Sequence, residues 1–241
     1  MEFPEALRAV RRGRRLSQLE LALRSGTTQR HLSFLESGRS QPGRGLVVRL
    51  GESMELSLRE RNELLLAAGF APVYPRTSLD DPALAHVHTA LRHLLTGHLP
   101  FPAIVVDADH VLLLANDAFG LLTEGVAPYL LEPPVNVLRL SLHPDGLAPR
   151  ILNLGHWAQH ILDRLAPGAL RDELTGYVPA VEVRPDHLGF AAPLRLKTDQ
   201  GELRLTTTIT SFATALDVTV AELKLEAFLP ADAATAALLA G

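Results

Sequence analysis

Apolar residues in the first 70 positions recur every three or four residues, which is the spacing of one face of an α-helix. The pattern predicts five short helices: one over residues 4–14, two within 17–42, one over 45–54, and one that opens at Ser57 and stops at Gly69. Amphipathic helices of this length bury their apolar faces against one another. This part of the chain is therefore predicted to be an all-α domain.

Residues with known capping preferences mark the helix ends in the segment 17–42. Ser17 followed by Glu20 is a capping-box pair, and Gly26 lies where the chain has to turn with a positive φ. The inner face of the first of these two helices is predicted to consist of Leu19, Ala22 and Leu23. The second helix keeps a polar face that its core-facing leucines leave exposed.

A short helix, a glycine turn and a second helix with an exposed polar face form the helix-turn-helix pattern, whose second helix enters the major groove of DNA. In that helix Gln29 can bond an adenine edge, and Arg30 can bond guanine O6 and N7. The further candidates for base or phosphate contacts are Thr28, Ser33, Phe34, Arg39, Ser40 and Arg44. For Phe34, a place in the hydrophobic core is an equally good interpretation.

Helical and alternating patterns are mixed in the rest of the chain. They predict a helix over 83–96, strands over 103–107 and 111–115, a short helix through Leu122, an irregular segment over 124–148, helices over 149–166 and 168–176, strands near 187–197, 202–211 and 221–229, and a last helix capped by Asp232. In the strand 202–211, apolar and polar residues alternate, with Leu203, Leu205, Thr207 and Ile209 on one face. We therefore predict an α+β domain with a five-stranded antiparallel sheet.

Domain boundaries follow from the prolines. The segment 70–82 contains three of them and cannot form a continuous helix, so residues 71–82 are predicted to be a linker. The all-α five-helix domain then covers residues 1–70, and the α+β domain covers residues 83–241.

These residues carry two resemblances to known families. Residues 3–70 resemble the lambda-repressor-like, or XRE-type, helix-turn-helix domain at Ser17-Gln18, Leu21-Ala22, Gly26, Gln29-Arg30, Leu32-Ser33, Leu35-Glu36, Gly38 and Pro42. The segments PAIVVDADHVLLLAN (102–116), NVLRLSLHPDG (136–146) and DVTVAELKLEAFLPAD (217–232) resemble the ligand-binding domain of MmyB-like transcription regulators, which has a PAS-like fold. The order of two strands, several helices and three further strands is also that of a PAS domain.

The resemblance implies a set of contacts and partners. Arg11 is expected to pair with Glu36, and Gln18 occupies a position that contacts phosphate in the family. The expected partners are double-stranded operator DNA, a second copy of the chain in a homodimer, and a small hydrophobic effector. No cofactor is expected to be required, and the bound small molecule is expected to be a fatty acid or a similar apolar compound.

A PAS-like sheet covered by helices encloses an apolar volume that can serve as a ligand site. The candidate wall residues are Leu112, Leu114, Phe119, Leu138, Leu140, Trp157, Ile161, Phe190, Leu205 and Ile209. Arg139 and His143 are candidates to hold a polar head group, because an ionised head needs a partner in such a site. Both also have a structural interpretation, since His143 begins a His-Pro-Asp-Gly turn and Arg139 can hold loop carbonyls.

Charge is divided unevenly along the chain. Residues 1–70 hold 12 Arg and 8 Glu, a net charge of +4, whereas the remainder carries −8. A basic first part and an acidic second part suggest that only the first approaches DNA. No apolar run reaches the roughly 20 residues of a membrane helix, so we expect a cytoplasmic protein without a membrane partner.

The sequence lacks the common enzyme and metal motifs. It contains no cysteine, no glycine-rich phosphate loop, no GxSxG elbow and no HExxH motif, so no catalytic residue and no metal ligand is predicted. Three functional hypotheses remain for the second domain. It senses a small apolar effector, it serves only as a ligand-free module for dimerisation and protein interaction, or it is an enzyme whose site these motifs do not reveal.

Overall fold

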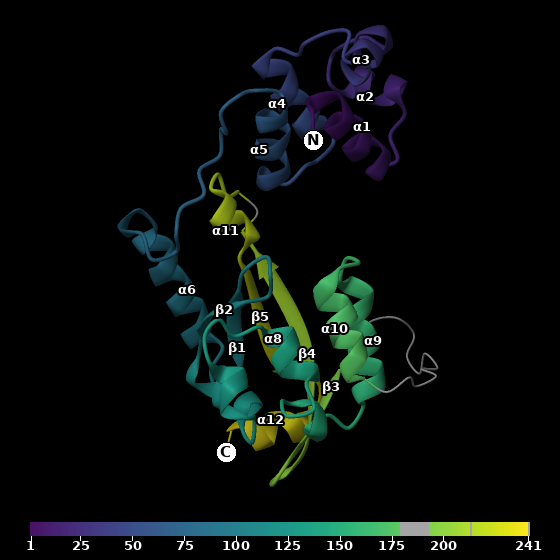
Figure 1. Cartoon of the computed structure of the whole chain (residues 1–241). Helices are drawn as coiled ribbons and strands as arrows, with labels where there is room; N and C mark the ends of the chain where they lie inside the picture. The colour runs from purple at the N-terminus through teal and green to yellow at the C-terminus, as the bar shows by residue number, and fades with distance from the viewer. Residues whose placement is uncertain (179–192, 213, 241) are drawn as a thin grey trace. The chain divides into compact units, whose positions relative to one another are not determined.

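The computed structural model describes residues 1–178, 193–212 and 214–240. The chain forms two compact units: Met1–Asp81 with Ala213–Ala221, and Pro82–Phe212 with Glu222–Gly241. The first unit is helical and the second contains the sheet (Figure 1). This bears out the predicted fold class, an all-α domain followed by an α+β domain.

Five helices form the core of the first unit. They are α1 (Phe3–Gly13), α2 (Gln18–Arg24), α3 (Gln29–Glu36), α4 (Arg44–Ser53) and α5 (Leu58–Ala67). Leucines from all five meet in one hydrophobic cluster. The predicted inner face of α2 was wrong in part: Leu21 and Ala22 are buried, whereas Leu19 and Leu23 are 52% and 72% exposed. Because α2 has only seven residues, its buried stripe is narrow, and two of its leucines fall outside it.

The turns between these helices use the predicted residues. Gly26 has φ +66°, and the Ser17 hydroxyl accepts a hydrogen bond from the Glu20 amide at 3.0 Å. Ser17 and Glu20 form only this one bond of the predicted capping box, and the Glu20 carboxylate instead accepts from Arg24 at 2.7 Å. Both bonds of a capping box are present at α5, where the Glu60 carboxylate accepts from the Ser57 amide at 2.8 Å. Each of the bonds to a backbone amide satisfies a donor that a helix start leaves without a partner.

The segment after α5 is fixed by side chains of its own unit. The Asn62 carboxamide oxygen accepts from the Val73 and Tyr74 amides at 3.0 and 3.1 Å. The short helix α11 (Val218–Glu222) returns to this segment, and the Val218 amide donates to the Pro75 carbonyl at 2.8 Å. The predicted strand 221–229 therefore begins later, as β5 (Lys224–Pro230), because α11 occupies its first residues.

The second unit contains a five-stranded antiparallel sheet with the strand order β2-β1-β5-β4-β3. Its strands are β1 (Ala103–Val106), β2 (Leu112–Ala115), β3 (Leu194–Thr198), β4 (Gly201–Ser211) and β5. The last strand of the chain thus lies at the centre, between β1 and β4. Most of the predicted strand 187–197 lies outside the described residues.

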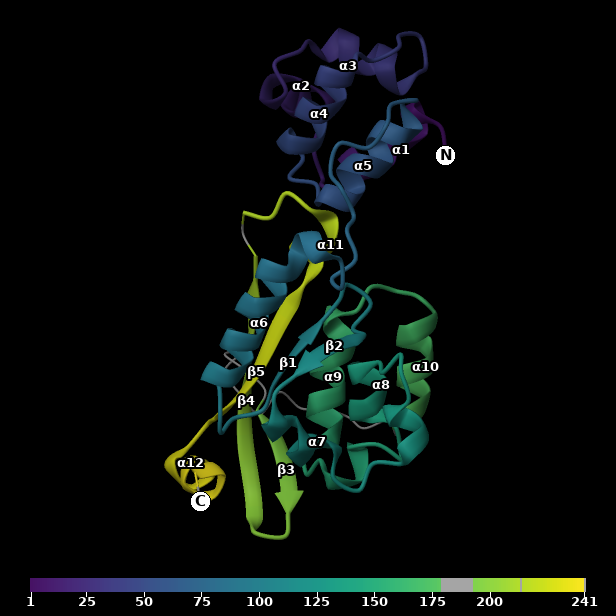
Figure 2. The same ribbon diagram turned by 90° about the vertical axis from the view of Figure 1, so that its left-hand side faces the viewer.

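Helices cover both faces of this sheet (Figure 1). The helix α6 (Ala85–Gly97) lies on one side, and α8 (Val137–Leu142), α9 (Leu154–Arg164) and α10 (Ala169–Tyr177) lie on the other; Figure 2 shows the three together beside the sheet. The remaining helices are α7 (Gly120–Thr123) and α12 (Ala233–Ala240), with short 3-10 turns at Pro82–Leu84, Asp117–Phe119, Pro128–Leu131 and Ala148–Arg150. The sheet and the helices α8, α9 and α10 share one hydrophobic core.

Two predicted segments differ from the structure. The segment 124–148 is not wholly irregular, because α8 lies within it and is capped by Asn136, whose side chain accepts from the Arg139 amide at 3.0 Å. The helix predicted from residue 149 begins at Leu154, because the residues before it pair with β3. The Leu152 amide donates to the Arg195 carbonyl at 2.8 Å, and Ile151 forms a bridge with Leu196.

Candidate DNA-reading surface and ligand pocket

The amino-terminal half of α3 carries an exposed polar surface. Thr28 caps the helix through a hydrogen bond that its hydroxyl accepts from the His31 amide at 3.1 Å, and Gln29 and Arg30 follow on the exposed side. The Arg30 and Arg39 guanidinium carbons lie 5.4 and 6.0 Å from the centre of the Phe34 ring. Phe34 is half-buried, lies near both arginines and is not a member of the hydrophobic cluster. The core interpretation of Phe34 is therefore disfavoured.

The other predicted DNA contacts lie on or next to α3. Ser33 is half-buried on the helix, Arg39 and Ser40 follow it in the loop, and Arg44 is the first residue of α4. Gly38 opens the loop with φ +71°, a conformation that costs glycine little. Arg39 and Arg44 are both exposed, and their contact with phosphate stays a prediction.

A buried ion pair holds α3 against the helices before it. The Arg11 guanidinium donates to both carboxylate oxygens of Glu36, at 2.5 and 2.8 Å, and to the Leu16 carbonyl at 2.7 Å. This is the pair that the family resemblance implied. The Gln18 amide nitrogen adds a bond to Glu36 at 2.9 Å. Gln18, which is predicted to contact phosphate, thus already uses one of its amide N–H groups in a hydrogen bond within the domain.

Burial raises the pKa of the Glu36 carboxyl, but the hydrogen bonds from Arg11 and Gln18 lower it by more, so the net pKa is below its usual range. The hydrogen bond from Arg11 to Glu36 in turn raises the pKa of the guanidinium. The carboxylate is therefore held in its charged form, and three of the five helices meet at it.

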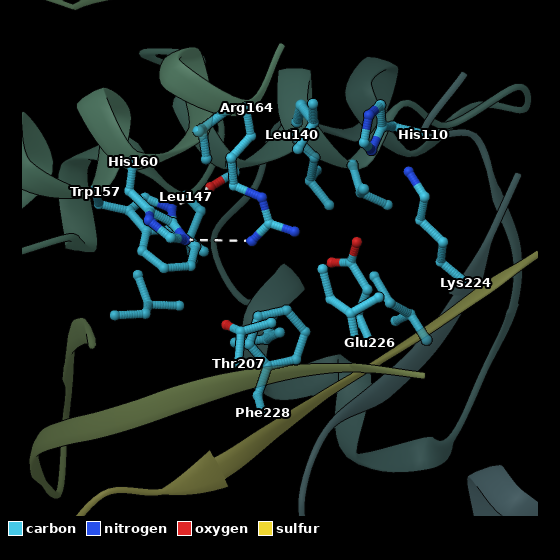
Figure 3. A pocket seen from close by; sticks show the side chains of 18 of the residues that line it. His110, Leu140, Leu147, Trp157, His160, Arg164, Thr207, Lys224, Glu226 and Phe228 are labelled. Carbon is cyan, nitrogen blue, oxygen red and sulfur yellow. Dashed lines mark hydrogen bonds between the residues drawn. The ribbon is translucent and has the colours of Figure 1, made fainter. Parts of the chain in front are cut away.

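A cavity of about 180 Å³ lies in the second unit between the sheet and the helices α8 and α9 (Figure 3). Cavities of roughly 150 Å³ with apolar walls can hold a molecule as large as benzene. Six of the predicted wall residues line it, namely Phe119, Leu138, Leu140, Trp157, Ile161 and Ile209. The expectation of an apolar volume at this place therefore agrees with the structure.

Other predicted wall and head-group residues lie elsewhere. Leu112, Leu114 and Leu205 are not part of the cavity lining, and Phe190 lies outside the described residues. The Arg139 guanidinium bonds both carboxylate oxygens of Glu173, at 2.6 and 2.8 Å. These bonds from Arg139, with one from Tyr177, lower the pKa of Glu173 to about 2. Arg139 thus has an anionic partner within the chain, and it does not line the cavity.

His143 also has a structural place. Its Nδ1 accepts from the Asp145 amide at 3.0 Å, and its ring meets the rings of Tyr129 and Tyr177 edge-on. These contacts fit the structural interpretation of the His-Pro-Asp-Gly turn, and His143 does not line the cavity either.

The cavity has a charged end that the sequence did not reveal. It is formed by Arg164 and His160 of α9, Lys224 and Glu226 of β5, and His110 of the turn between β1 and β2. Arg164 Nη1 and His160 Nε2 lie 3.5 Å apart. In β5, residues 224, 226 and 228 share one face, and cross-strand pairing places Glu226 between Ile104 and Ile209. Burial between these neighbours raises the pKa of the Glu226 carboxyl, against the opposing charges of Lys224 and Arg164.

His110 reaches the cavity from a strained turn. Its φ is +60°, an uncommon value for a residue with a side chain. Asp107 fixes the turn, because its carboxylate accepts from the Asp109 and Val111 amides at 2.9 and 2.8 Å. Burial and the nearby Lys224 lower the pKa of the imidazole. Among the described residues, two buried side-chain nitrogen or oxygen atoms have no hydrogen-bond partner, His110 Nδ1 and Thr207 Oγ1, and both residues line this cavity.

Comparison with known proteins identifies both parts of the chain. Residues 87–240 match the family described as MmyB-like transcription regulator ligand binding domain, and residues 7–61 match the helix-turn-helix family. The chain belongs to the MmyB-like transcription regulators. This MmyB-like regulator thus combines an XRE-type helix-turn-helix domain with a ligand-binding domain, as its sequence indicated.

Two individual proteins are similar to this MmyB-like regulator. The uncharacterized HTH-type transcriptional regulator y4dL of Sinorhizobium fredii is 41% identical over 96 residues, which are 39% of this chain and 46% of that protein. The match therefore spans about half the length of that relative. The structure of an RNA-binding light-oxygen-voltage receptor has 15% identity and a TM-score of 0.29 over 95% of this chain and 58% of that one, a similarity too low to support an argument.

No helix among the described residues of the MmyB-like regulator is long and apolar enough to cross a membrane. Within the same residues, no three histidine, cysteine, aspartate or glutamate side chains are grouped so as to hold a metal ion.

Proposed function

We propose that this protein is a sequence-specific, operator-binding regulator of transcription whose second domain senses a small hydrophobic effector of the fatty-acid type. The observation that carries the proposal is the cavity beside β5, which combines apolar walls with one charged end. Such a division suits a molecule with an apolar body and a polar head. We further propose that the protein acts by binding rather than by catalysis, in the cytoplasm, where bacterial operators lie.

DNA recognition is assigned to the exposed face of α3. Gln29 and Arg30 are exposed at the start of that helix, and Arg39 and Arg44 stand beside it. The first two would read base edges in the major groove, and the second two would contact phosphates. The buried pair of Arg11 and Glu36 supports this assignment, because it fixes α3 on the rest of the domain.

The proposed active form is a homodimer that reads two half-sites. In helix-turn-helix dimers the half-sites lie about 34–36 Å apart, so small changes in the placement of the two recognition helices alter affinity. An effector that binds one arrangement better than the other would shift the population between them. By reciprocity, operator DNA would change the affinity for the effector by the same factor.

The test is a selection of bound sequences from random DNA by the full chain, with and without a bacterial lipid extract. The selected operator is then titrated with protein while a defined medium-chain acid, decanoic acid, is varied. Affinity that changes with decanoic acid supports effector sensing. Unchanged operator affinity despite proven binding of the acid contradicts the regulatory role. Native mass spectrometry that finds a dimer with no retained or added ligand favours the ligand-free dimerisation module instead.

A further inference from the structure

The charged end of the cavity brings together groups that are distant in the sequence. Arg164 comes from α9, Lys224 and Glu226 come from β5, and His110 comes from the β1–β2 turn. Figure 3 shows the Arg164 guanidinium, the Lys224 ammonium and the Glu226 carboxylate directed into the same part of the cavity. With Glu226 ionised and both histidines neutral, this end carries one excess positive charge.

We propose that this charged end binds the carboxylic acid head of the effector together with one proton, which Glu226 carries in the complex. The inference rests on the proposed function, since it takes the cavity to hold an apolar acid. It adds which groups hold the head and in which protonation state they do so. Arg164, rather than Arg139, is then the principal anchor.

Arg164 and Lys224 provide the attraction for an anionic head. A carboxylate that enters an apolar cavity needs charged or hydrogen-bonding partners. Among the described residues, Arg164 contacts His160 through one of the five N–H groups of its guanidinium, and the other N–H groups can bind a carboxylate. Lys224 adds a second cation on the side of β5.

Glu226 would oppose the same head if it stayed ionised. Two carboxylates that share one site disfavour each other's charged form, so the pKa of one of them rises. Glu226 is prepared for this role, because Ile104 and Ile209 flank it across the sheet and burial already favours its neutral form. A protonated Glu226 can also donate a hydrogen bond to the bound carboxylate.

Every element around Glu226 contributes to its electrostatic environment. α9 presents Arg164 and His160, β5 presents Lys224, and the β1–β2 turn presents His110 with Asp107 and Asp109 behind it. β4 and α8 contribute uncharged hydroxyls, Thr207 and Ser141, and the latter accepts from the Trp157 indole at 2.9 Å. His110 is the main competitor for the proton, but burial and Lys224 disfavour its charged form.

The sign of the expected pH dependence follows from this assignment. An anionic head raises the pKa of Glu226 in the complex above that in the free protein. Binding therefore takes up a proton between these two values, and affinity for the acid falls as pH rises through that interval. Uptake of one proton can change the affinity by at most about tenfold per pH unit. A neutral alcohol of the same chain length does not repel the Glu226 carboxylate and lacks this dependence.

The experiment uses the full chain and two probes, decanoic acid and 1-decanol, between pH 6 and 9. Trp157 is the single tryptophan and lines the cavity, so its fluorescence reports occupancy. Calorimetry in buffers of different ionisation enthalpy counts the protons taken up. We expect uptake of up to one proton with decanoic acid for the wild type, and close to none for E226Q, whose affinity for the acid becomes independent of pH.

Three further variants separate the roles. R164Q should lower the affinity for decanoic acid roughly ten- to a hundredfold, because a charged hydrogen-bonded anchor is lost. The affinity for 1-decanol should change little. R204Q is the matched control, since Arg204 lies on the other face of β4 with its side chain 52% exposed. H110N removes the imidazole at a positive φ that asparagine tolerates.

Proton uptake that persists in E226Q but vanishes in H110N places the proton on His110 and overturns the proposal, as does binding of decanoic acid without uptake in the wild type. If E226Q does not fold, absence of uptake in the wild type still overturns the proposal, and uptake that persists in H110N excludes His110 as the site of the proton. If neither probe changes the fluorescence of Trp157, the proposed effector class has failed instead, and the two failures are thereby distinguished.

Discussion

Replacing Glu36 with glutamine removes the negative charge at which α1, α2 and α3 meet. The Glu36 side chain is 3% exposed and that of Arg11 is 10% exposed, so the variant leaves a buried guanidinium without its counter-ion. The new amide also directs an N–H group at the donors of Arg11 or Gln18. Breaking a buried pair by removing one partner costs about 3–5 kcal/mol. For a domain whose total stability is about 5–15 kcal/mol, this is a large fraction.

Hydrogen exchange of the full chain, followed by mass spectrometry, measures this effect. Peptides from α1–α5 report the opening free energy of the first unit, while the fluorescence of Trp157 reports the second. R14A is the matched control, because it removes an arginine from an exposed pair with Glu60 at 3.0 Å, with side chains 43% and 38% exposed. Exposed pairs of this kind contribute about 0–1 kcal/mol. An E36Q effect no larger than that of R14A would refute the reasoning.

Two additional measurements sharpen the test. The double variant R11M/E36L should recover most of the lost stability, because buried ion pairs can be replaced by apolar residues at little cost. The lowered pKa of Glu36 means that its stabilising contribution is complete above the unfolded value and is lost as pH falls through the folded value. The opening free energy should therefore decline below about pH 4.5 in the wild type and less so in E36Q.

Three further predictions concern other parts of the chain. R30A should weaken operator binding by about 1–3 kcal/mol and relax the preference at one base pair, whereas R39A should weaken binding to all DNA sequences alike. Selection from random DNA distinguishes the two outcomes. G146A should destabilise the second unit by about 1–3 kcal/mol, because its Cβ would lie 2.2 Å from the Leu140 carbonyl oxygen, whereas G120A meets nothing within 4 Å; thermal melts followed by Trp157 compare them. R139Q should change the affinity for decanoic acid by less than about twofold, since the partly exposed Arg139 pairs with Glu173; a loss as large as that in R164Q would return the anchor to Arg139.

Local sequence signals predicted the first domain well. Gly26 and Gly38 adopt the positive φ values that glycine favours, Ser57 and Glu60 form both bonds of a capping box, and the core leucines follow the helical period. These features depend on residues three or four apart, so the sequence contains them directly. The error at Leu19 and Leu23 arose because a helix of two turns has too few residues to fix the direction of its buried stripe.

The pocket was predicted in its apolar walls but not in its charged end. In β5, Leu225 and Ala227 suggest the buried face, which would leave Lys224 and Glu226 facing solvent. The strand is instead central and covered on both faces, so the second face lines the cavity. Period-two alternation identifies two faces of a strand but does not say what covers each of them. The sequence held one hint of the charged end: Lys224 is one of only two lysines in the chain.

Glu36 and Glu226 are two buried or partly buried carboxylates with different surroundings. Glu36 receives hydrogen bonds from Arg11 and Gln18, and these hold its pKa low despite burial. Glu226 has two cations nearby, yet Figure 3 shows no hydrogen bond to it from the residues drawn, and burial raises its pKa. A buried carboxylate that is hydrogen-bonded by side chains of its own domain stabilises that domain. A carboxylate that faces a cavity next to donors without partners is suited to bind a ligand. Apart from Lys224, the neighbours that distinguish the two glutamates are distant in sequence, so residue type alone gives both the same description.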